Sequence, residues 1–400
     1  MESATLTEAS LTITRAPLPH HFATEKLELQ TQPDSGIIST LTPTQKVIVE
    51  CLAERCPFVS VSESLLDSDL TQILQNGGLD SPGMLIFKAS LEARLSLKAS
   101  IPITSLLRAQ TIRALETEIM KVSVASSREL LLPFSTEGSR TPLFLFPPGG
   151  GELHCWIELA RRFHDRPLYG LRLRGLQPGE TAFGSMDEMV TSFFAEIRKV
   201  QPRGPYALLG MCFGGNVAFE VAKALEAAGE VVAFVGGIDN APNILQMSFA
   251  TLRFFIVDLL LTRRLITPSE ASLLKKETCD QDPALLPGLV MRRFRTRLQS
   301  AGVTRERLES WHRVFCGTVH MADGYIPRGK IATYTSFWAD PLEEWGVSKD
   351  EWETRVREWG DFADSSSFHF VGGNHYTALT KDHVRDFKAV LDRQLQLCGV

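Results

Sequence analysis

The sequence predicts an α/β protein whose main domain contains a mostly parallel sheet, preceded by a small helical domain. From about residue 141 onward, short apolar segments alternate with amphipathic ones, a pattern typical of parallel strands joined by right-handed helical crossovers. Between residues 43 and 121 the apolar residues recur instead at helical spacing, which indicates three or four helices. These two patterns together define the expected fold class.

The α/β part contains segments with the length and composition of buried strands. We expect strands at 142–146, 167–171, 206–210, 231–238, 331–338 and 366–371. Amphipathic stretches between them predict helices at 152–163, 186–200, 214–228 and 382–396. The stretch 244–324 interrupts the alternation and is helical, so we expect a lid of about residues 241–325 inserted between two strands.

The composition argues against several classes of function. The formal net charge is −5 and no block of Lys or Arg occurs, so nucleic acid is not an expected partner. The longest apolar stretch, 254–261, is too short to cross a bilayer and contains Asp258. The 7 cysteines are odd in number, irregularly spaced and without a metal-binding pattern, which favours a reducing, cytoplasmic setting and no metal.

A chain of 400 residues is long enough for more than one domain, and changes in composition and in the spacing of apolar residues indicate the boundaries. Residues 1–40 are rich in Thr, Ser, Pro and Gln and are expected to be a linker. The helical domain should occupy 41–122, a second linker 123–140 and the α/β domain 141–400. A chain that opens on so long a linker is expected to be a fragment of a larger protein.

A nucleophile turn is predicted between the strand at 206–210 and the helix that follows. Gly210-Met211-Cys212-Phe213-Gly214 fits the pattern G-x-nucleophile-x-G, in which side chains at the two glycine positions would clash. The start of the helix favours a thiolate and stabilises an oxyanion. Cys212 is therefore the candidate nucleophile, and a buried thiol in a tight turn or a replaced serine are the alternative interpretations.

Two further residues complete a candidate triad. Asp239 ends the strand after that of Cys212, and His375 follows the last predicted strand, so the chain order is nucleophile, acid, histidine. Asp340, at the end of the following strand, is the rival acid, and the preference for Asp239 comes from the family resemblance described below. His320 in the lid and His369 inside a strand are weaker candidates for the base.

A glycine loop after the first strand of this domain is expected to supply an oxyanion donor. The loop reads "FPPGGGELHCW", and the predicted donors are the N–H groups of Phe213 and Gly149, with Gly150 as an alternative. A phosphate-binding loop is the competing interpretation. It is disfavoured because neither G-K-[ST] nor G-x-G-x-x-G is present.

Three stretches of the chain resemble a known family. "RPLYGLRLRGLQPGE", "GPYALLGMCFGGNVAFEVAKALEAAGEVVAFVGGIDNAP" and "GGNHYTAL" are similar to the type I thioesterase domain that ends nonribosomal peptide and polyketide synthetases. The resemblance covers roughly residues 141–398. It implies an α/β-hydrolase fold with Cys212 as nucleophile, Asp239 as acid and His375 as base.

The helical domain resembles an acyl carrier, or thiolation, domain. "GGLDS" matches the G-x-D-S turn of that family, which implies a 4′-phosphopantetheine arm on Ser81 with Asp80 beside it. An Asp-Ser pair at a helix start is also a common N-cap. Pro82 and Gly83 depart from the family pattern, which usually has apolar residues at these two positions. This departure suggests that the helix recognises its partners differently.

The narrower resemblance is to fungal single-module synthetase-like enzymes with adenylation, thiolation and thioesterase domains. "RPLYGLRLRGLQPGE" and "GNHYTALTKDHVRDF" carry it. It implies condensation of two aryl 2-oxo acids into a quinone, furanone or related ring, with an upstream adenylation domain and a phosphopantetheinyl transferase as partners. Two other functions are weighed: a thioester or lactone hydrolase like dienelactone hydrolase, suggested by "GMCFGG", and an inactive carrier-binding module.

Overall fold

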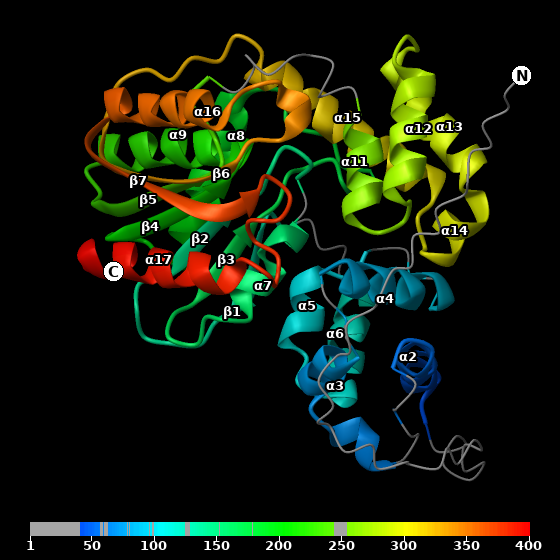
Figure 1. Ribbon diagram of the computed structural model, residues 1–400. Coiled ribbons are helices and arrows are strands. Elements are labelled where there is room, and N and C mark those ends of the chain that lie inside the picture. The colour runs from blue at the N-terminus through cyan, green and yellow to red at the C-terminus, as the bar shows by residue number, and fades with distance from the viewer. Residues whose placement is uncertain are drawn as a thin grey trace, which may run out of the picture.

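The protein folds into a helical unit and a larger α/β unit with a helical lid (Figure 1). The computed structural model describes residues 41–56, 59, 63–77, 79, 81–95, 97, 100–124, 129–151, 153–177, 179–243 and 254–400. The predicted linker at 1–40 lies outside these residues.

Residues 41–124 form the helical unit. Its helices are η1 (Glu63–Asp67), α2 (Pro43–Ala53), α3 (Leu70–Asn76), α4 (Ser81–Arg94), α5 (Ile103–Arg108) and α6 (Ile112–Val124). α2 begins at Pro43, because Thr42 and Gln45 form a capping box there and Pro43 occupies the first turn. Apolar residues of these helices, among them Leu52, Phe87 and Leu115, are fully buried, in a core that continues into the α/β unit.

The α/β unit is built on a 7-stranded sheet in the order β1-β3-β2-β4-β5-β6-β7. Its strands are β1 (Leu131–Ser135), β2 (Leu143–Phe146), β3 (Leu168–Leu171), β4 (Tyr206–Met211), β5 (Val232–Ile238), β6 (Ile331–Asp340) and β7 (Ala363–Asn374). β1 alone is antiparallel, to β3. It lies inside the segment expected to be a linker. Pro133 is tolerated there because β1 is an edge strand.

Helices cover both faces of the sheet (Figure 1). The covering elements are η2 (Leu153–Trp156), α7 (Ile157–Ala160), α8 (Met186–Val200), α9 (Phe213–Ala227) and α17 (Val384–Leu397). Side chains alternate along each strand: Leu143 and Leu145 join the core of α7 and α17, whereas Phe144 and Phe146 join that of α8 and α9. The first predicted helix is shorter than expected. It consists of η2 and the single turn α7.

The lid lies between β5 and β6, which are nevertheless neighbours in the sheet. Its helices are α11 (Phe255–Thr262), α12 (Pro268–Thr278), η4 (Pro283–Leu285), α13 (Leu286–Arg293), α14 (Arg295–Ser300) and α15 (Arg305–Ala322). They enclose a separate apolar cluster that includes Leu260, Leu274 and Trp311. The expected helical lid is therefore present.

A second insertion between β6 and β7 was not predicted. It contains η5 (Glu343–Trp345), α16 (Lys349–Arg357) and η6 (Glu358–Phe362). Trp345 and Trp352 of this insertion pack together in a cluster with Ala241 at the end of β5. The insertion thus reaches the edge of the sheet where the strands end. In the part of the chain that the structure describes, no helix combines the length and hydrophobicity needed to span a bilayer.

Candidate active site

Cys212 occupies a strained turn between β4 and α9. Its backbone has φ 55° and ψ −128°, a conformation that non-glycine residues rarely adopt. A Cβ on Gly210 would lie 2.1 Å from the carbonyl oxygen of Gly214, so this close approach requires glycine. The turn is held by hydrogen bonds from Cys212 N–H to Ile238 O and from Gly215 N–H to Cys212 O, both 2.8 Å. The thiol remains partly exposed.

The glycine loop after β2 lies against the start of α9. A Cβ on Gly214 would be 2.5 Å from the carbonyl oxygens of Phe146 and Pro147. This contact brings the loop that contains Gly149 to the same helix terminus as Phe213, the first residue of α9. The two predicted oxyanion donors therefore come from adjoining backbone segments, as a pair of N–H groups acting on one oxygen requires.

Asp239 and His375 are brought together at the carboxyl edge of the sheet. Asp239 Oδ2 lies 2.7 Å from His375 Nδ1. The other carboxylate oxygen, Oδ1, accepts hydrogen bonds from the Trp352 indole N–H at 3.0 Å and the Ala339 backbone N–H at 3.2 Å. The Asp239 side chain is completely buried, so these three partners replace its water shell and fix its orientation.

The loop that presents His375 follows β7 directly. Gly372 and Gly373 have φ of 74° and 67°, which lets the chain turn sharply away from the strand. Asn374 Oδ1 then accepts from the N–H groups of Tyr376 and Thr377. His375 is therefore held between two locally bonded residues, with 14% of its side chain exposed.

Charge around the ring raises the pKa of His375. Burial by itself lowers this pKa, but the electrostatic interaction with Cys212 and the hydrogen bond to Asp239 outweigh burial. A hydrogen bond to Cys212 acts in the same direction, and the resulting pKa is about 10. The ring thus interacts with Cys212 on one side and Asp239 on the other, the arrangement in which a histidine can hold or release a proton of the thiol.

The rival residues lie in other surroundings. Asp340 forms an ion pair with Lys349 at 2.8 Å and is half exposed. His369 lies in β7 as predicted, with its ring centroid 5.9 Å from that of Phe337. His320 lies in the last turn of α15. The hydrogen bonds and ion pairs of the described residues join none of the three to Asp239 or Cys212.

Two tryptophans near the site were missed by the sequence analysis. Trp352 donates to Asp239, and the Trp345 ring packs edge-on against His375 with centroids 5.2 Å apart. Both are nearly buried. A signal was available, because "PLEEWGVSKDEW" follows a strand that ends beside Asp239. Tryptophans in a polar segment do not by themselves indicate which residue they contact.

Ser81 is the first residue of α4. Its side chain, and Asp80 entirely, lie outside the described residues. The neighbouring Leu79 carbonyl lies 3.5 Å from Arg161 Nη1, at the end of α7. The N-terminal end of α4 is thus next to the α/β unit. Leu85, one turn further on, lines a cavity of about 70 Å³ that Gly151 of the glycine loop also lines.

A mixed sheet, a strained turn between β4 and α9 and a helical lid are the features of an α/β-hydrolase fold, and residues 141–254 match the thioesterase domain family. The fold is shared with the solved Vlm2 thioesterase domain (TM-score 0.51, 22% identity, covering 66% of this chain and 96% of that one). It is shared also with holo-AB3403, a four-domain nonribosomal peptide synthetase (TM-score 0.57, 20% identity, 88% of this chain and 26% of that one). The predicted α/β-hydrolase fold is confirmed.

Curated relatives place the chain more narrowly. Nonribosomal peptide synthetase ucdA of Aspergillus ustus is 32% identical over 100% of this chain and 43% of its own length. Aspulvinone E synthetase melA of Aspergillus terreus is 34% identical over 81% of this chain and 36% of its own length. Atromentin synthetase nps3 of Serpula lacrymans is 32% identical over 75% of this chain and 32% of its own length. The chain belongs with the thioesterase-containing part of fungal nonribosomal-peptide-synthetase-like enzymes, and it spans less than half the length of these relatives.

Proposed function

We propose that this chain transfers a carrier-bound acyl group to Cys212 and releases it by forming a carbon–carbon bond with a second acyl unit. The observation that carries the proposal is the 2.7 Å contact between Asp239 Oδ2 and His375 Nδ1, on a ring that also interacts with Cys212. Nucleophile, base and orienting acid are the three parts that covalent acyl transfer requires.

In the first step Cys212 attacks the carbonyl carbon of a thioester. A bond from Sγ to that carbon forms, the carbonyl oxygen becomes an oxyanion, and the original carbon–sulfur bond then breaks. His375, held by Asp239, keeps the proton taken from Cys212 and delivers it to the departing thiolate. The acyl group remains a thioester throughout, because sulfur replaces sulfur.

The N–H groups of Phe213 and Gly149 are proposed to stabilise the oxyanion. The Gly149 loop lies under the lid, since a Cβ on Gly149 would be 3.2 Å from Thr318 Cγ2 of α15. A Cβ on Gly150 would be 2.9 Å from the ring of Phe255. Apolar cover over this loop excludes water and strengthens hydrogen bonds to a developing charge.

The helical unit, residues 41–122, is proposed to be the carrier, and residues 141–400 the thioesterase. A 4′-phosphopantetheine arm on Ser81 would supply the thiol that holds the acyl group. The residues fit this assignment in one respect: Ser81 is the first residue of α4, and Leu79, two residues before it, contacts Arg161 of the α/β unit. In the complete enzyme an upstream adenylation domain and a phosphopantetheinyl transferase would be the partners.

In the second step a carbon nucleophile from another acyl unit attacks the thioester on Cys212. His375 takes the proton from that carbon, the carbon–carbon bond forms, and the departing Cys212 thiolate takes the proton back from His375. The dimer is then still a thioester of the carrier, and cyclisation, in which a nucleophile of the dimer attacks that thioester and the carrier thiol leaves, releases the product.

A thioester favours this Claisen-type reaction because its carbonyl is less resonance-stabilised than an ester's and therefore more open to attack. In an aryl 2-oxo acyl group the acidic proton of the attacking unit lies on the benzylic carbon, next to the 2-oxo group. The resemblance to aryl 2-oxo acid synthetases, and the relatives named for aspulvinone E and atromentin, support an aryl 2-oxo acid as substrate.

The test is product analysis with the wild type, Cys212→Ser and Cys212→Ala after Ser81 has been loaded with an arylpyruvyl group. We expect the wild type to form a condensed dimer, the serine variant to release mainly free acid, and the alanine variant to do neither. The same dimer at the same rate from Cys212→Ser would contradict the role of sulfur. Turnover of a soluble lactone without any loading would favour the simple hydrolase. No adduct and no turnover would favour an inactive module.

A further inference from the structure

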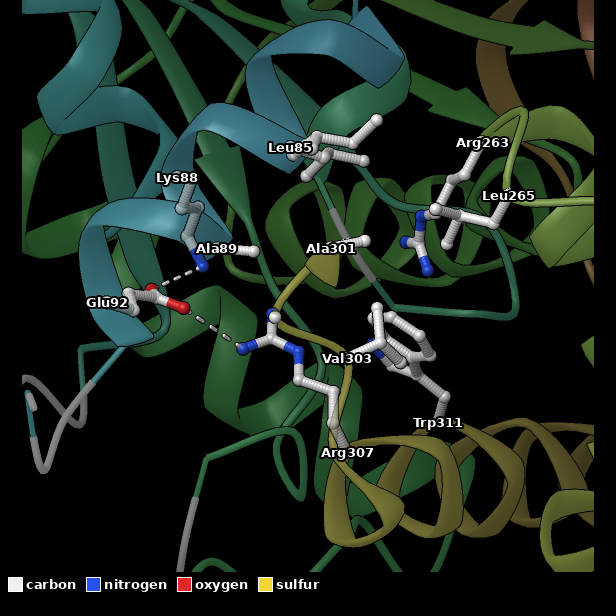
Figure 2. Close-up of a pocket in the computed structure, with 12 residues that line it drawn as sticks. Leu85, Lys88, Ala89, Glu92, Arg263, Leu265, Ala301, Val303, Arg307 and Trp311 are labelled. Atoms are coloured by element: carbon white, nitrogen blue, oxygen red, sulfur yellow. Dashed lines mark ion pairs between the residues drawn. The ribbon is translucent and has the colours of Figure 1, made fainter. Parts of the chain in front are cut away.

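A cluster of polar side chains joins the helical unit to the first turns of lid helix α15 (Figure 2). Glu92 Oε2 of α4 lies 3.8 Å from Arg307 Nη1, which also donates to Ser100 Oγ at 3.1 Å. Lys88 Nζ lies 2.7 Å from Glu92 Oε1. These charged side chains are largely buried, with 7% of Lys88, 16% of Glu92 and 25% of Arg307 exposed. Directional contacts in such surroundings fix the position of one surface on the other.

Glu92 is the centre of this cluster. Its Oε1 accepts hydrogen bonds from Ser100 Oγ and Ile101 N–H, both at 2.7 Å. Burial raises the pKa of Glu92, but the charges of Lys88 and Arg307 and the hydrogen bonds around the carboxyl outweigh burial and lower it. The carboxylate therefore stays charged at neutral pH, and it links the helical unit to Arg307 of the lid.

Apolar contacts beside the cluster show how closely the two surfaces fit. Gly302, in the turn before α15, has φ +65°, and a Cβ there would lie 2.6 Å from Ala89 Cβ of α4. Ile86 of α4 packs against the apolar cluster of the lid. The space left between α4 and the lid is a cavity of only about 30 Å³. A larger side chain at residue 302 would separate these surfaces.

The same helix continues from this contact to the acyl-transfer site. The Arg307 guanidinium lies 5.4 Å from the Trp311 ring, one turn further along α15. Another turn on, Phe315 stacks on Phe255 with centroids 3.7 Å apart. A Cβ on Gly149 would lie 3.6 Å from the Phe315 ring. Arg307 and Phe315 are eight residues apart, about 12 Å along a helix.

We propose that α15 couples docking of the helical unit to the position of the Gly149 loop. Its partner is α4, recognised through the carboxylate of Glu92 and the small side chain of Ala89. With α4 docked, Arg307 holds the first turns of α15, and Phe315 and Thr318 are held over the loop. When α4 leaves, the lid helix loses its anchor, and water gains access to an acyl group on Cys212. This inference rests on the proposed function.

The test compares Arg307→Ala with Arg305→Ala in the full chain. Arg305 is two residues away on the same helix and forms an exposed ion pair with Glu309. Two quantities are measured: the rate at which an acyl group passes from Ser81 to Cys212, and the amide hydrogen exchange of residues 146–151 without any acyl group. Circular dichroism checks that both variants are folded.

We expect Arg307→Ala to slow transfer about tenfold, the effect of losing one hydrogen bond to a charged group. Exchange in residues 146–151 should accelerate severalfold, whereas Arg305→Ala should change neither quantity. If Arg307→Ala slows transfer but leaves the exchange of residues 146–151 unchanged, Arg307 is only a local docking contact and the coupling is overturned. The coupling is also overturned if neither the transfer rate nor the exchange changes. If the wild type never acylates Cys212, the proposed function fails, and the exchange experiment still decides the coupling by itself.

Discussion

Trp352 donates its indole N–H to Asp239 Oδ1 at 3.0 Å, on the carboxylate whose other oxygen contacts His375. Trp352 comes from the insertion between β6 and β7, while Asp239 directly follows β5. Trp352 therefore orients the carboxylate of Asp239, although no sequence motif points to this tryptophan. Because Trp352 does not touch the reacting atoms, its role is that of a positioning residue.

Trp352→Phe should lower the rate of acyl transfer about tenfold, because a buried charged acceptor loses one of its hydrogen bonds. It should also shift the downfield proton resonance of His375 Nδ1. Trp359→Phe is the matched control, since Trp359 is equally buried but donates to the Asn240 carbonyl. The control should reduce stability without moving the resonance. Equal effects of the two variants on the resonance would refute the positioning role.

Asp239→Asn should reduce acyl transfer by about 10³- to 10⁴-fold, because an amide does not hold the imidazole in the tautomer that accepts a proton from the nucleophile. Asp340→Asn removes only a half-exposed ion pair with Lys349 and should leave the rate nearly unchanged. Single-turnover kinetics of the two variants show which of the two carboxylates orients His375. A larger loss in Asp340→Asn would reverse the assignment.

Stability should depend on pH through His375. Its pKa is raised from 6.5 to about 10, so the folded protein keeps a proton that the unfolded chain releases across this interval. The stabilising contribution is therefore complete below pH 6.5 and is lost as the pH rises toward 10.

The measurement is the free energy of urea unfolding for wild type and His375→Gln at both ends of this pH range. We expect the difference between the two proteins to shrink as the pH rises. Asp239→Asn should narrow the difference at low pH, because the hydrogen bond to Asp239 contributes to the shift. A difference that stays constant across the range would mean that His375 has no raised pKa.

Gly214→Ala should destabilise the protein by about 1–3 kcal/mol, the usual cost of overpacking, and abolish activity. The added methyl would lie 2.5 Å from the carbonyl oxygens of Phe146 and Pro147. Gly317→Ala, inside α15 with open space around the position, should instead raise the thermal midpoint slightly. Thermal unfolding of the two variants checks this contrast, and a stable, active Gly214→Ala protein would contradict the described turn.

The sequence predicted the strands and helices around the nucleophile because each has a strong local signal. The apolar strand at 206–210, the glycines at 210 and 214 and the following amphipathic helix all indicate the same turn. β1 was missed because a short segment containing Pro133 has little strand character, and its antiparallel pairing with β3 is a tertiary contact. The helix expected at 152–163 was too long, because only one α-helical turn follows η2.

Chain order carried information about proximity: it predicted that Cys212, Asp239 and His375 lie near one another, and Asp239 Oδ2 lies 2.7 Å from His375 Nδ1. The site was not predictable where contacts come from distant insertions. Trp352 is 113 residues from Asp239. The pairing of Glu92 with Arg307 joins residues in two different units of the fold. Neither contact has a local pattern, so both required the folded chain.

The central claim is that Cys212 accepts the acyl group, and mass spectrometry of peptides from the acid-quenched protein tests it most directly. Ser81 is loaded with an arylpyruvyl pantetheine, the protein is quenched in acid, and peptides are assigned. The account predicts an acyl adduct on Cys212 in the wild type, and an acyl group that stays on Ser81 in Cys212→Ala. Product formation at the wild-type rate by Cys212→Ala, or an acyl group that never leaves Ser81 in the wild type, would contradict it.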